Sequence, residues 1–168
     1  MFSAFNSNTL RVYSWNANGV KKNLEELKDS IIFHNPDLIG IQETHLRPLD
    51  RISIPNYTCH ISDRRTHRGG GAAIFVKNSI KHHAIVSTSS TLENTTVIIQ
   101  LGNNTQITMA CIYKHPTAPL MLPKSMLFTP IIIEPFSLEI LMQNTRVGTQ
   151  GEAMLMFIFL AIGRLALL

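Results

Sequence analysis

Two carboxamides follow the first apolar segment of the chain, where a strand is expected to end. Leu10–Trp15 is typical of a short strand, and Asn16, Asn18 and Gly19 come directly after it. Asparagine accepts hydrogen bonds from water and donates them to phosphate oxygens, and α/β folds bind ligands at the carboxyl ends of strands. The same residues also suit a plain turn, because asparagine tolerates left-handed backbone and glycine prefers it. Both interpretations stay open on spacing alone.

A carboxylate follows the second apolar segment. Apolar residues recur at helical spacing from Val20 to Ile31, and Pro36 ends that helix before a second strand at Asp37–Gln42. A strand, helix, strand order predicts a parallel pair whose carboxyl ends share one edge of the sheet. Glu43 and Asn16 would then meet there, and oxygen donors of this kind suit magnesium. A solvated strand end is the alternative for Glu43.

A basic segment lies in the polar, irregular stretch from Arg51 to Arg68. Arg64, Arg65 and Arg68 directly precede a run of three glycines. Arginine pairs well with phosphate, so this loop could contact a nucleic-acid backbone. A merely solvated charged face is the common alternative. The glycines match neither a dinucleotide-binding nor a nucleoside-triphosphate loop and look like the entry to a strand.

Further strands are expected after the glycines. Ala72–Val76 is apolar throughout, and alternation in Val97–Leu101 and Ile107–Tyr113 around a Gly-Asn-Asn turn predicts a β-hairpin. Tyr113 could present its hydroxyl to a phosphate, although a core tyrosine is commoner. The neighbouring His82 and His83 would point to opposite sides of an extended chain and make a poor metal pair.

Composition bounds the class of protein. The chain has 168 residues with 45% hydrophobic and 15% charged content, which suits one folded domain and excludes a disordered chain. The net charge is +4, and it arises from residues 1–118, with 12 Lys+Arg against 8 Asp+Glu (12 − 8 = +4). That bias favours polyanionic partners. Two cysteines and no visible signal peptide predict an intracellular, reducing location.

Four ordered stretches together resemble a known family: Trp15–Gly19, Ile41–His45, Arg68–Ile74 and Ile112–Pro116. Their order is similar to that of the endonuclease/exonuclease/phosphatase superfamily. Within it, the chain most resembles the apurinic-like endonuclease domain that begins the polyproteins of jockey-like non-LTR retrotransposons, beside their reverse transcriptase. The resemblance covers roughly Leu10 to Pro116, about the N-terminal half of such a domain.

The resemblance implies a DNase I-like, four-layered α/β sandwich that cuts DNA phosphodiesters with Mg²⁺ or Mn²⁺. By position, Glu43 would be the metal carboxylate, and Asn16 would orient phosphate or a metal-bound water as a second ligand. Asn18 would support this edge, Tyr113 would contact the scissile phosphate, and the basic loop would hold DNA. An intact element would act in the nucleus, with element RNA and reverse transcriptase as further partners. A metal at such a site polarises the phosphoryl oxygen and stabilises the leaving group.

The chain departs from the family after Ala118. The family's Gly-Asp-x-Asn and Ser-Asp-His segments, which position water and supply acid/base groups, are missing, and residues 119–168 contain neither aspartate nor histidine. We therefore expect an N-terminal extension (1–9), a partial endonuclease domain (10–118) and an unrelated apolar tail (119–168). The predicted fold class is a truncated half of the α/β sandwich. Catalysis should be impaired, because acid/base groups contribute orders of magnitude of rate.

The tail and the functional class leave alternatives. The segment from Ala153 to Leu168 is apolar apart from Arg164, and it could be an unrelated extension, a buried helix or strand, or, least favoured, a membrane anchor. The inner face of the half-sandwich should be bare unless this tail covers it. The chain would then be either an impaired endonuclease fragment or a non-catalytic nucleic-acid-binding or interaction half-domain. Oligomeric state and target sequence stay open.

Overall fold

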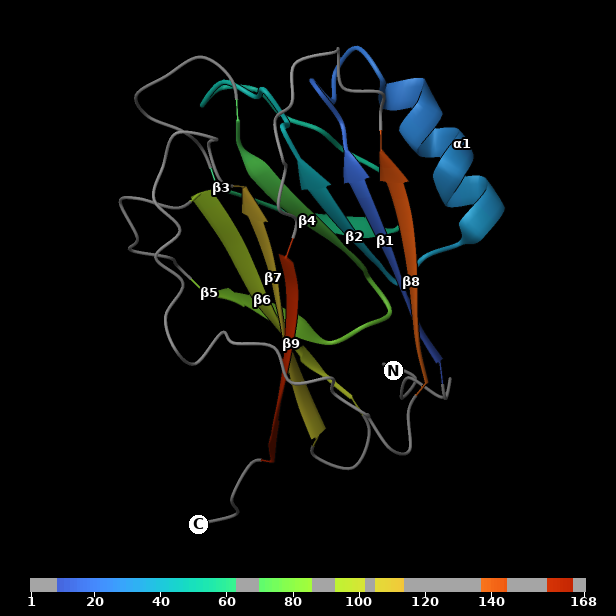
Figure 1. Cartoon of the computed structure of the whole chain (residues 1–168), viewed down its shortest axis with the longest axis vertical. Helices are drawn as coiled ribbons and strands as arrows, with labels where there is room; N and C mark the ends of the chain where they lie inside the picture. Colours follow the sequence, from blue (N-terminus) through green and yellow to red (C-terminus); the bar gives the residue numbers. More distant parts are fainter. Residues whose placement is uncertain are drawn as a thin grey trace.

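Two β-sheets face each other, and one helix covers the outer face of the first sheet (Figure 1). The computed structural model describes residues 9–62, 70–85, 93–101, 105–113, 137–144 and 157–164. A helix layer and two sheet layers confirm the predicted α/β class.

The first sheet has the strand order β3-β4-β2-β1-β8. Its strands are β1 (Thr9–Asn16), β2 (Leu38–Gln42), β3 (Tyr57–Ser62), β4 (Ala72–Lys77) and β8 (Ser137–Asn144). β1 runs parallel to both neighbours, with Asn16 opposite Gln42 on one side and Asn144 on the other. The predicted parallel pair is therefore confirmed, and three strands end together at one edge, which we call the carboxyl edge.

The crossover between β1 and β2 is the helix α1 (Leu24–His34). It ends where the sequence predicts, because Asn35 adopts left-handed backbone as the C-cap and Pro36 follows. Its start is later than the apolar spacing suggests. The Val20 N–H donates to the Thr44 carbonyl (3.1 Å) across the sheet edge, so Val20 belongs to the loop and not to the helix.

The second sheet has the order β5-β6-β7-β9. It consists of β5 (His82–Ile85), β6 (Glu93–Gln100), β7 (Thr105–Tyr113) and β9 (Phe157–Arg164), all paired antiparallel. The predicted hairpin is confirmed as β6 and β7, in register from Glu93 opposite Tyr113 to Gln100 opposite Gln106.

The main core lies between the two sheets. It joins Val12, Leu38 and Ile74 of the first sheet to Val97, Ile99, Ile107, Met109 and Cys111 of the second. Gly40 faces the second sheet, because a Cβ at this position would make ordinary contacts with Met109 Cε (3.4 Å) and Cys111 Sγ (3.6 Å). The expectation of a bare inner face is wrong, because β6 and β7 themselves cover β2 and β4.

A second core lies on the other face of the first sheet. Leu27 of α1 packs there with Tyr13 and Trp15 of β1, and the loop residues Ile52 and Ile54 close the cluster. Strands buried on both faces read as continuous apolar runs, which is why β1, β2 and β4 are recognisable in the sequence.

The strand β3 was missed by the sequence analysis. The stretch Arg51–Arg68, expected to be irregular, contains β3, which pairs antiparallel with β4. Tyr57, Cys59 and Ile61 alternate toward the outer core as partly buried residues. Thr58, His60 and Ser62 on the other face lower the mean hydropathy and hid this period.

The tail contributes strands to both sheets. β8 pairs with β1 and β9 pairs with β7, so each tail strand lies beside a strand of the N-terminal part. The predicted boundary after Ala118 lies outside the described residues and stays a prediction. In the described residues no helix is long and apolar enough to cross a bilayer.

Candidate functional site

Three loops are joined by backbone hydrogen bonds at the carboxyl edge. The loop after β1 donates to the loop after β2, from Ala17 N to Gln42 O (2.9 Å) and from Gly19 N to Glu43 O (2.7 Å). The loop after β2 in turn donates to the entry of β4, from His45 N to Gly70 O (3.0 Å). Residues far apart in sequence are thus held at one place by main-chain contacts. The predicted convergence of Asn16 and Glu43 on one edge is confirmed at the level of the backbone.

Asn16 is buried at the end of β1. Its Oδ1 accepts a hydrogen bond from the Asn18 N–H (3.0 Å), which forms an Asx turn and fixes the side-chain orientation. Asn18 itself is exposed in left-handed backbone, with φ 41°.

Glu43 is partly exposed directly after β2. Its side chain keeps 21% of its surface accessible, and its Oε2 lies 3.9 Å from His45 Nε2. That separation exceeds hydrogen-bond distance, so the two groups are neighbours without a direct bond. A partly exposed carboxylate that makes no direct bond to the neighbouring imidazole could bind a small ligand.

Left-handed backbone is concentrated at this edge. In the part of the chain that the structure describes, the non-glycine residues with positive φ are three asparagines, Glu43 (φ 50°) and His45 (φ 53°). Asparagine tolerates this region, but a residue such as glutamate pays about 1–2 kcal/mol to occupy it. Backbone strain of this kind tends to cluster where function requires a particular side-chain position. Both strained non-asparagine residues belong to the loop after β2.

Gly71 is required where the loop after β2 meets β4. It has φ +88°, and a Cβ there would collide with Thr44 Oγ1. The Thr44 N–H donates to Gly71 O (3.3 Å), so the close approach is part of the loop junction. The glycine run of the sequence therefore serves as an entry to a strand, as predicted.

Tyr113 ends β7 in the second sheet, on the same side as the carboxyl edge. Gln42 Nε2 donates to Cys111 Sγ (3.2 Å), which places Cys111 beside the end of β2. Tyr113 follows two residues later, about 7 Å further along the strand at the usual rise. Burial raises the pKa of the Cys111 thiol to about 12, so it is a neutral core group.

Other predicted residues lie beyond the described structure. Arg64, Arg65 and Arg68 fall in residues 63–69, and their role in binding DNA stays a prediction. Two residues at this edge were missed by sequence reasoning: Asn144, which is in register with Asn16, and Glu93, which is opposite Tyr113. Asn144 could not be found, because no signal in the tail reveals that β8 pairs with β1.

The donors at this edge fit a hard cation that keeps most of its waters. One carboxylate (Glu43) and one carboxamide oxygen (Asn16) are the kinds of ligand that Mg²⁺ accepts, since it retains several waters in most protein sites. Within the described residues no cluster of three or more His, Cys, Asp or Glu could hold a metal ion. A tightly caged structural metal is thus not built here by the described side chains.

The chain is similar in sequence to proteins of mobile elements. Over 110 residues the chain is 30% identical to the RNA-directed DNA polymerase from mobile element jockey of Drosophila melanogaster, covering 64% of this chain and 12% of that protein. The Drosophila funebris counterpart is 33% identical over 75 residues, covering 44% of this chain and 8% of the relative. The chain thus spans about a tenth of the length of these curated relatives.

Two solved structures are similar to part of this chain. The catalytic domain of Xenopus laevis APE2 has 20% identity and a TM-score of 0.43, covering 61% of this chain and 44% of that one. An AP endonuclease from Archaeoglobus fulgidus has 15% identity and a TM-score of 0.40, covering 55% and 37%.

The family match covers most of the chain. Residues 13–144 match the Endonuclease/Exonuclease/phosphatase family, a span that begins in β1 and ends at the last residue of β8. The resemblance predicted from four ordered stretches is therefore confirmed, and with it the DNase I-like class of the partial fold. The chain belongs to the Endonuclease/Exonuclease/phosphatase family.

Proposed function

We propose that this chain is the partial endonuclease domain of a non-LTR mobile element, which binds DNA phosphates with Mg²⁺ or Mn²⁺ and is impaired in hydrolysis. The observation that carries the proposal is the junction of three loops at the carboxyl edge, which holds Glu43 in left-handed backbone beside the buried Asn16. Backbone strain tends to be kept where it positions a functional side chain, so the strain at Glu43 supports a ligand-binding role for its carboxylate.

Each residue has a role that follows from its position. Glu43 would hold the cation, and Asn16, oriented by its Asx turn, would hold a phosphate oxygen or a water bound to the cation. Asn18 would support this arrangement through its main chain, and Tyr113 would contact phosphate from the facing sheet. When bound, the cation polarises a phosphoryl oxygen and stabilises developing negative charge.

Hydrolysis is expected to be weak because residues 119–168 contain neither the aspartate nor the histidine that fill the family's acid/base roles. The imidazole of His45 lies at this edge, but it is next to the Glu43 carboxylate. It would compete with the cation for that carboxylate and is not assigned as the missing acid/base group. A positioned general acid or base contributes about 10²- to 10⁴-fold in rate. The proposal therefore separates binding, which should persist, from cleavage, which should be slight.

Nicking of supercoiled plasmid in Mg²⁺ by the purified chain tests the proposal. The comparison is with Glu43→Gln, which keeps the shape and removes the charge, and with Asp29→Asn, which removes an exposed carboxylate from α1 away from the edge. We expect retention of DNA by the wild type in a gel-shift assay, together with slow nicking. Glu43→Gln should abolish that nicking, and Asp29→Asn should leave it unchanged.

Two outcomes would contradict the proposal. Rapid nicking by the wild type that Glu43→Gln abolishes would show that the tail supplies the missing groups, so catalysis is not impaired. Absence of DNA binding at low salt would show that this chain does not act on nucleic acid. Binding without any nicking would favour the second candidate, a nucleic-acid-binding half-domain, which the basic bias of residues 1–118 supports.

A further inference from the structure

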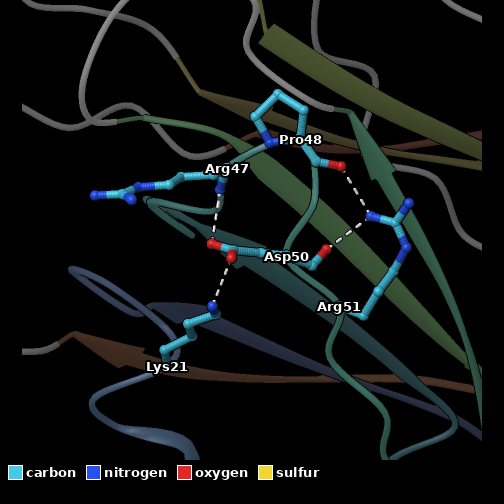
Figure 2. A network of polar contacts seen from close by, with 5 residues as sticks. All are labelled: Lys21, Arg47, Pro48, Asp50 and Arg51. Atoms are coloured by element: carbon cyan, nitrogen blue, oxygen red, sulfur yellow. Dashed lines mark hydrogen bonds and ion pairs between the residues drawn. The ribbon is translucent and has the colours of Figure 1, made fainter.

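A network of polar contacts lies on the surface next to the carboxyl edge. It consists of Lys21, Arg47, Pro48, Asp50 and Arg51, and we call it the Asp50 cluster (Figure 2). Lys21 comes from the loop after β1, and the other four residues come from the loop after β2. The cluster therefore joins the same two loops that hold Asn16 and Glu43.

Asp50 is the centre of the cluster. Its Oδ1 lies 2.6 Å from Lys21 Nζ, and its Oδ2 accepts from the Arg47 N–H (2.9 Å). These contacts, the Lys21 hydrogen bond first, lower the pKa of the Asp50 carboxyl. The Asp50 N–H also donates back to Arg47 O (2.8 Å), which closes a tight turn. Both carboxylate oxygens are engaged, so Asp50 acts as a brace and not as a metal ligand.

The guanidinium groups of the two arginines lie in different surroundings. Arg51 Nη1 donates to the carbonyls of Pro48 and Asp50 (2.9 Å each), so its guanidinium is held by neutral acceptors. The Arg47 guanidinium points away from Asp50 in Figure 2, and its side chain is exposed. Within the described residues no salt bridge joins either arginine to an acidic group. Arg47 thus extends away from a braced turn, and Arg51, which is also exposed, is held against that turn.

Lys22 adds positive charge between the cluster and the site, and it lies near His45. Lys22 and His45 both border Gly19, since a Cβ on that glycine would lie 3.3 Å from Lys22 Cε and 3.4 Å from His45 Nδ1. Counting Lys21, Lys22, Arg47 and Arg51 against Asp50 gives a formal charge of 4 − 1 = +3 on this surface. A surface of one sign beside a proposed phosphate site would attract a polyanion.

We propose that Arg47 and Arg51, braced by Asp50, bind backbone phosphates of duplex DNA on the flank of the carboxyl edge. This inference rests on the proposed function and names a DNA-contacting surface distinct from the basic stretch at residues 63–69. Guanidinium groups pair with phosphate through paired N–H donors, and the Arg51 side chain, already held by two carbonyls, loses less entropy on binding. Phosphate contacts position the duplex and carry no sequence information.

The test is fluorescence anisotropy with a short labelled duplex and the full chain, in EDTA, over a range of salt concentrations. Arg47→Ala/Arg51→Ala removes both proposed contacts. Arg11→Ala/Lys81→Ala is the matched control, because it removes the same charge from exposed positions. Both positions lie near the strand ends, of β1 and β4, that are away from the carboxyl edge. Circular dichroism of each variant confirms that its secondary structure is retained.

We expect the arginine double variant to bind about tenfold more weakly near 0.1 M salt, with the slope of log affinity against log salt reduced by about 2. The control should reduce affinity only slightly. Equal losses in the two double variants would overturn the inference while leaving DNA binding intact. A wild type that shows no salt-dependent DNA binding either in EDTA or in Mg²⁺ would overturn the proposed function as well, so the two failures are distinguishable.

Discussion

The two ends of β2 each carry a carboxylate, and the structure treats them in opposite ways. Asp37, just before the strand, accepts from the Arg11 N–H (3.0 Å) through Oδ2 and lies 3.3 Å from Lys77 Nζ through Oδ1. Its own main chain also pairs with Arg11 and Lys77 on the neighbouring strands. Asp37 is therefore a fully used structural group that ties β1 to β4 through β2.

Glu43, just after the strand, has no comparable set of contacts. Its side chain is more exposed than that of Asp37 (21% against 12%), and His45 Nε2 stands 3.9 Å away. Its main chain is strained, whereas near Asp37 the positive-φ residues are Asn35 and Asn56, which tolerate that backbone. One end of the strand is optimised for stability, and the other keeps a carboxylate in a costly position.

Tyr57 reinforces the Asp37 end. Its hydroxyl donates to Pro36 O (2.5 Å), and burial, followed by the negative charge of Asp37, raises its pKa to about 12. The phenol therefore stays a neutral donor over the whole working pH range. The comparison teaches that the polar groups at this end serve the fold, so that changes there should affect stability and leave ligand binding intact.

The largest effect is expected from breaking the loop junction at the Glu43 end. Gly71→Ala combines a forbidden φ with a collision against Thr44, which should cost about 3 kcal/mol of unfolding free energy. Urea denaturation measures this. Gly40→Ala is the control, because its added methyl would meet Met109 at 3.4 Å, a near-ordinary contact, and should cost less. Equal costs would mean that the junction is not strained.

Removing the carboxylate at the Asp37 end should be the next largest change. Asp37→Asn leaves the Lys77 amine without its counter-charge in a partly buried place, and we expect a loss of about 2 kcal/mol. Cation and DNA binding should not change. A loss of cation affinity in this variant, measured by calorimetry, would contradict the division of roles between the two ends.

Replacing the carboxylate at the other end of β2 by asparagine should change stability in the opposite direction. Glu43→Asn places a residue that accepts left-handed backbone at φ 50° and should stabilise the chain by about 1 kcal/mol. The same variant should lose cation binding. The urea midpoints of Glu43→Asn and Asp37→Asn, measured side by side, compare the stability of the two variants. Destabilisation by both substitutions would show that Glu43 is a structural residue.

The smallest effect concerns a histidine remote from both ends. Burial, and then the neighbouring His82 ring at 5.1 Å, lower the pKa of His60. The folded state then binds fewer protons than the unfolded state, so stability should fall as pH drops through about 6.5, the ordinary histidine pKa. His60→Gln should flatten this slope in urea titrations between neutral and mildly acid pH. An unchanged slope would assign the acid sensitivity to other groups.

Much of the site could be predicted because it depends on local patterns. Apolar runs reveal β1 and β2, and the residue types that follow them reveal the carboxyl edge. The strain at Glu43 and His45 could not be predicted, since it arises from backbone bonds to Gly19 and Gly70 in other loops. The brace at Asp50 was missed for the same reason, because Lys21 lies 29 residues away in sequence.

The pairing of the tail with the N-terminal part of the chain could not be predicted from the sequence. Ser137–Asn144 has no turn signals or alternation that would distinguish it from an unrelated extension, and its partner β1 lies more than a hundred residues earlier. Pairing between strands so far apart in sequence leaves little local trace, because neither segment by itself specifies its partner. The position of Asn144 beside Asn16 therefore comes from the structure alone.

The most direct test of the account is a Mn²⁺ titration followed by electron paramagnetic resonance, in which the signal of free Mn²⁺ reports the bound fraction. The wild type should bind Mn²⁺ saturably, Mg²⁺ should compete, and Glu43→Gln should lose this binding while Asp37→Asn retains it. Equal binding by the wild type and Glu43→Gln would contradict the central claim that the strained carboxylate after β2 is a cation ligand.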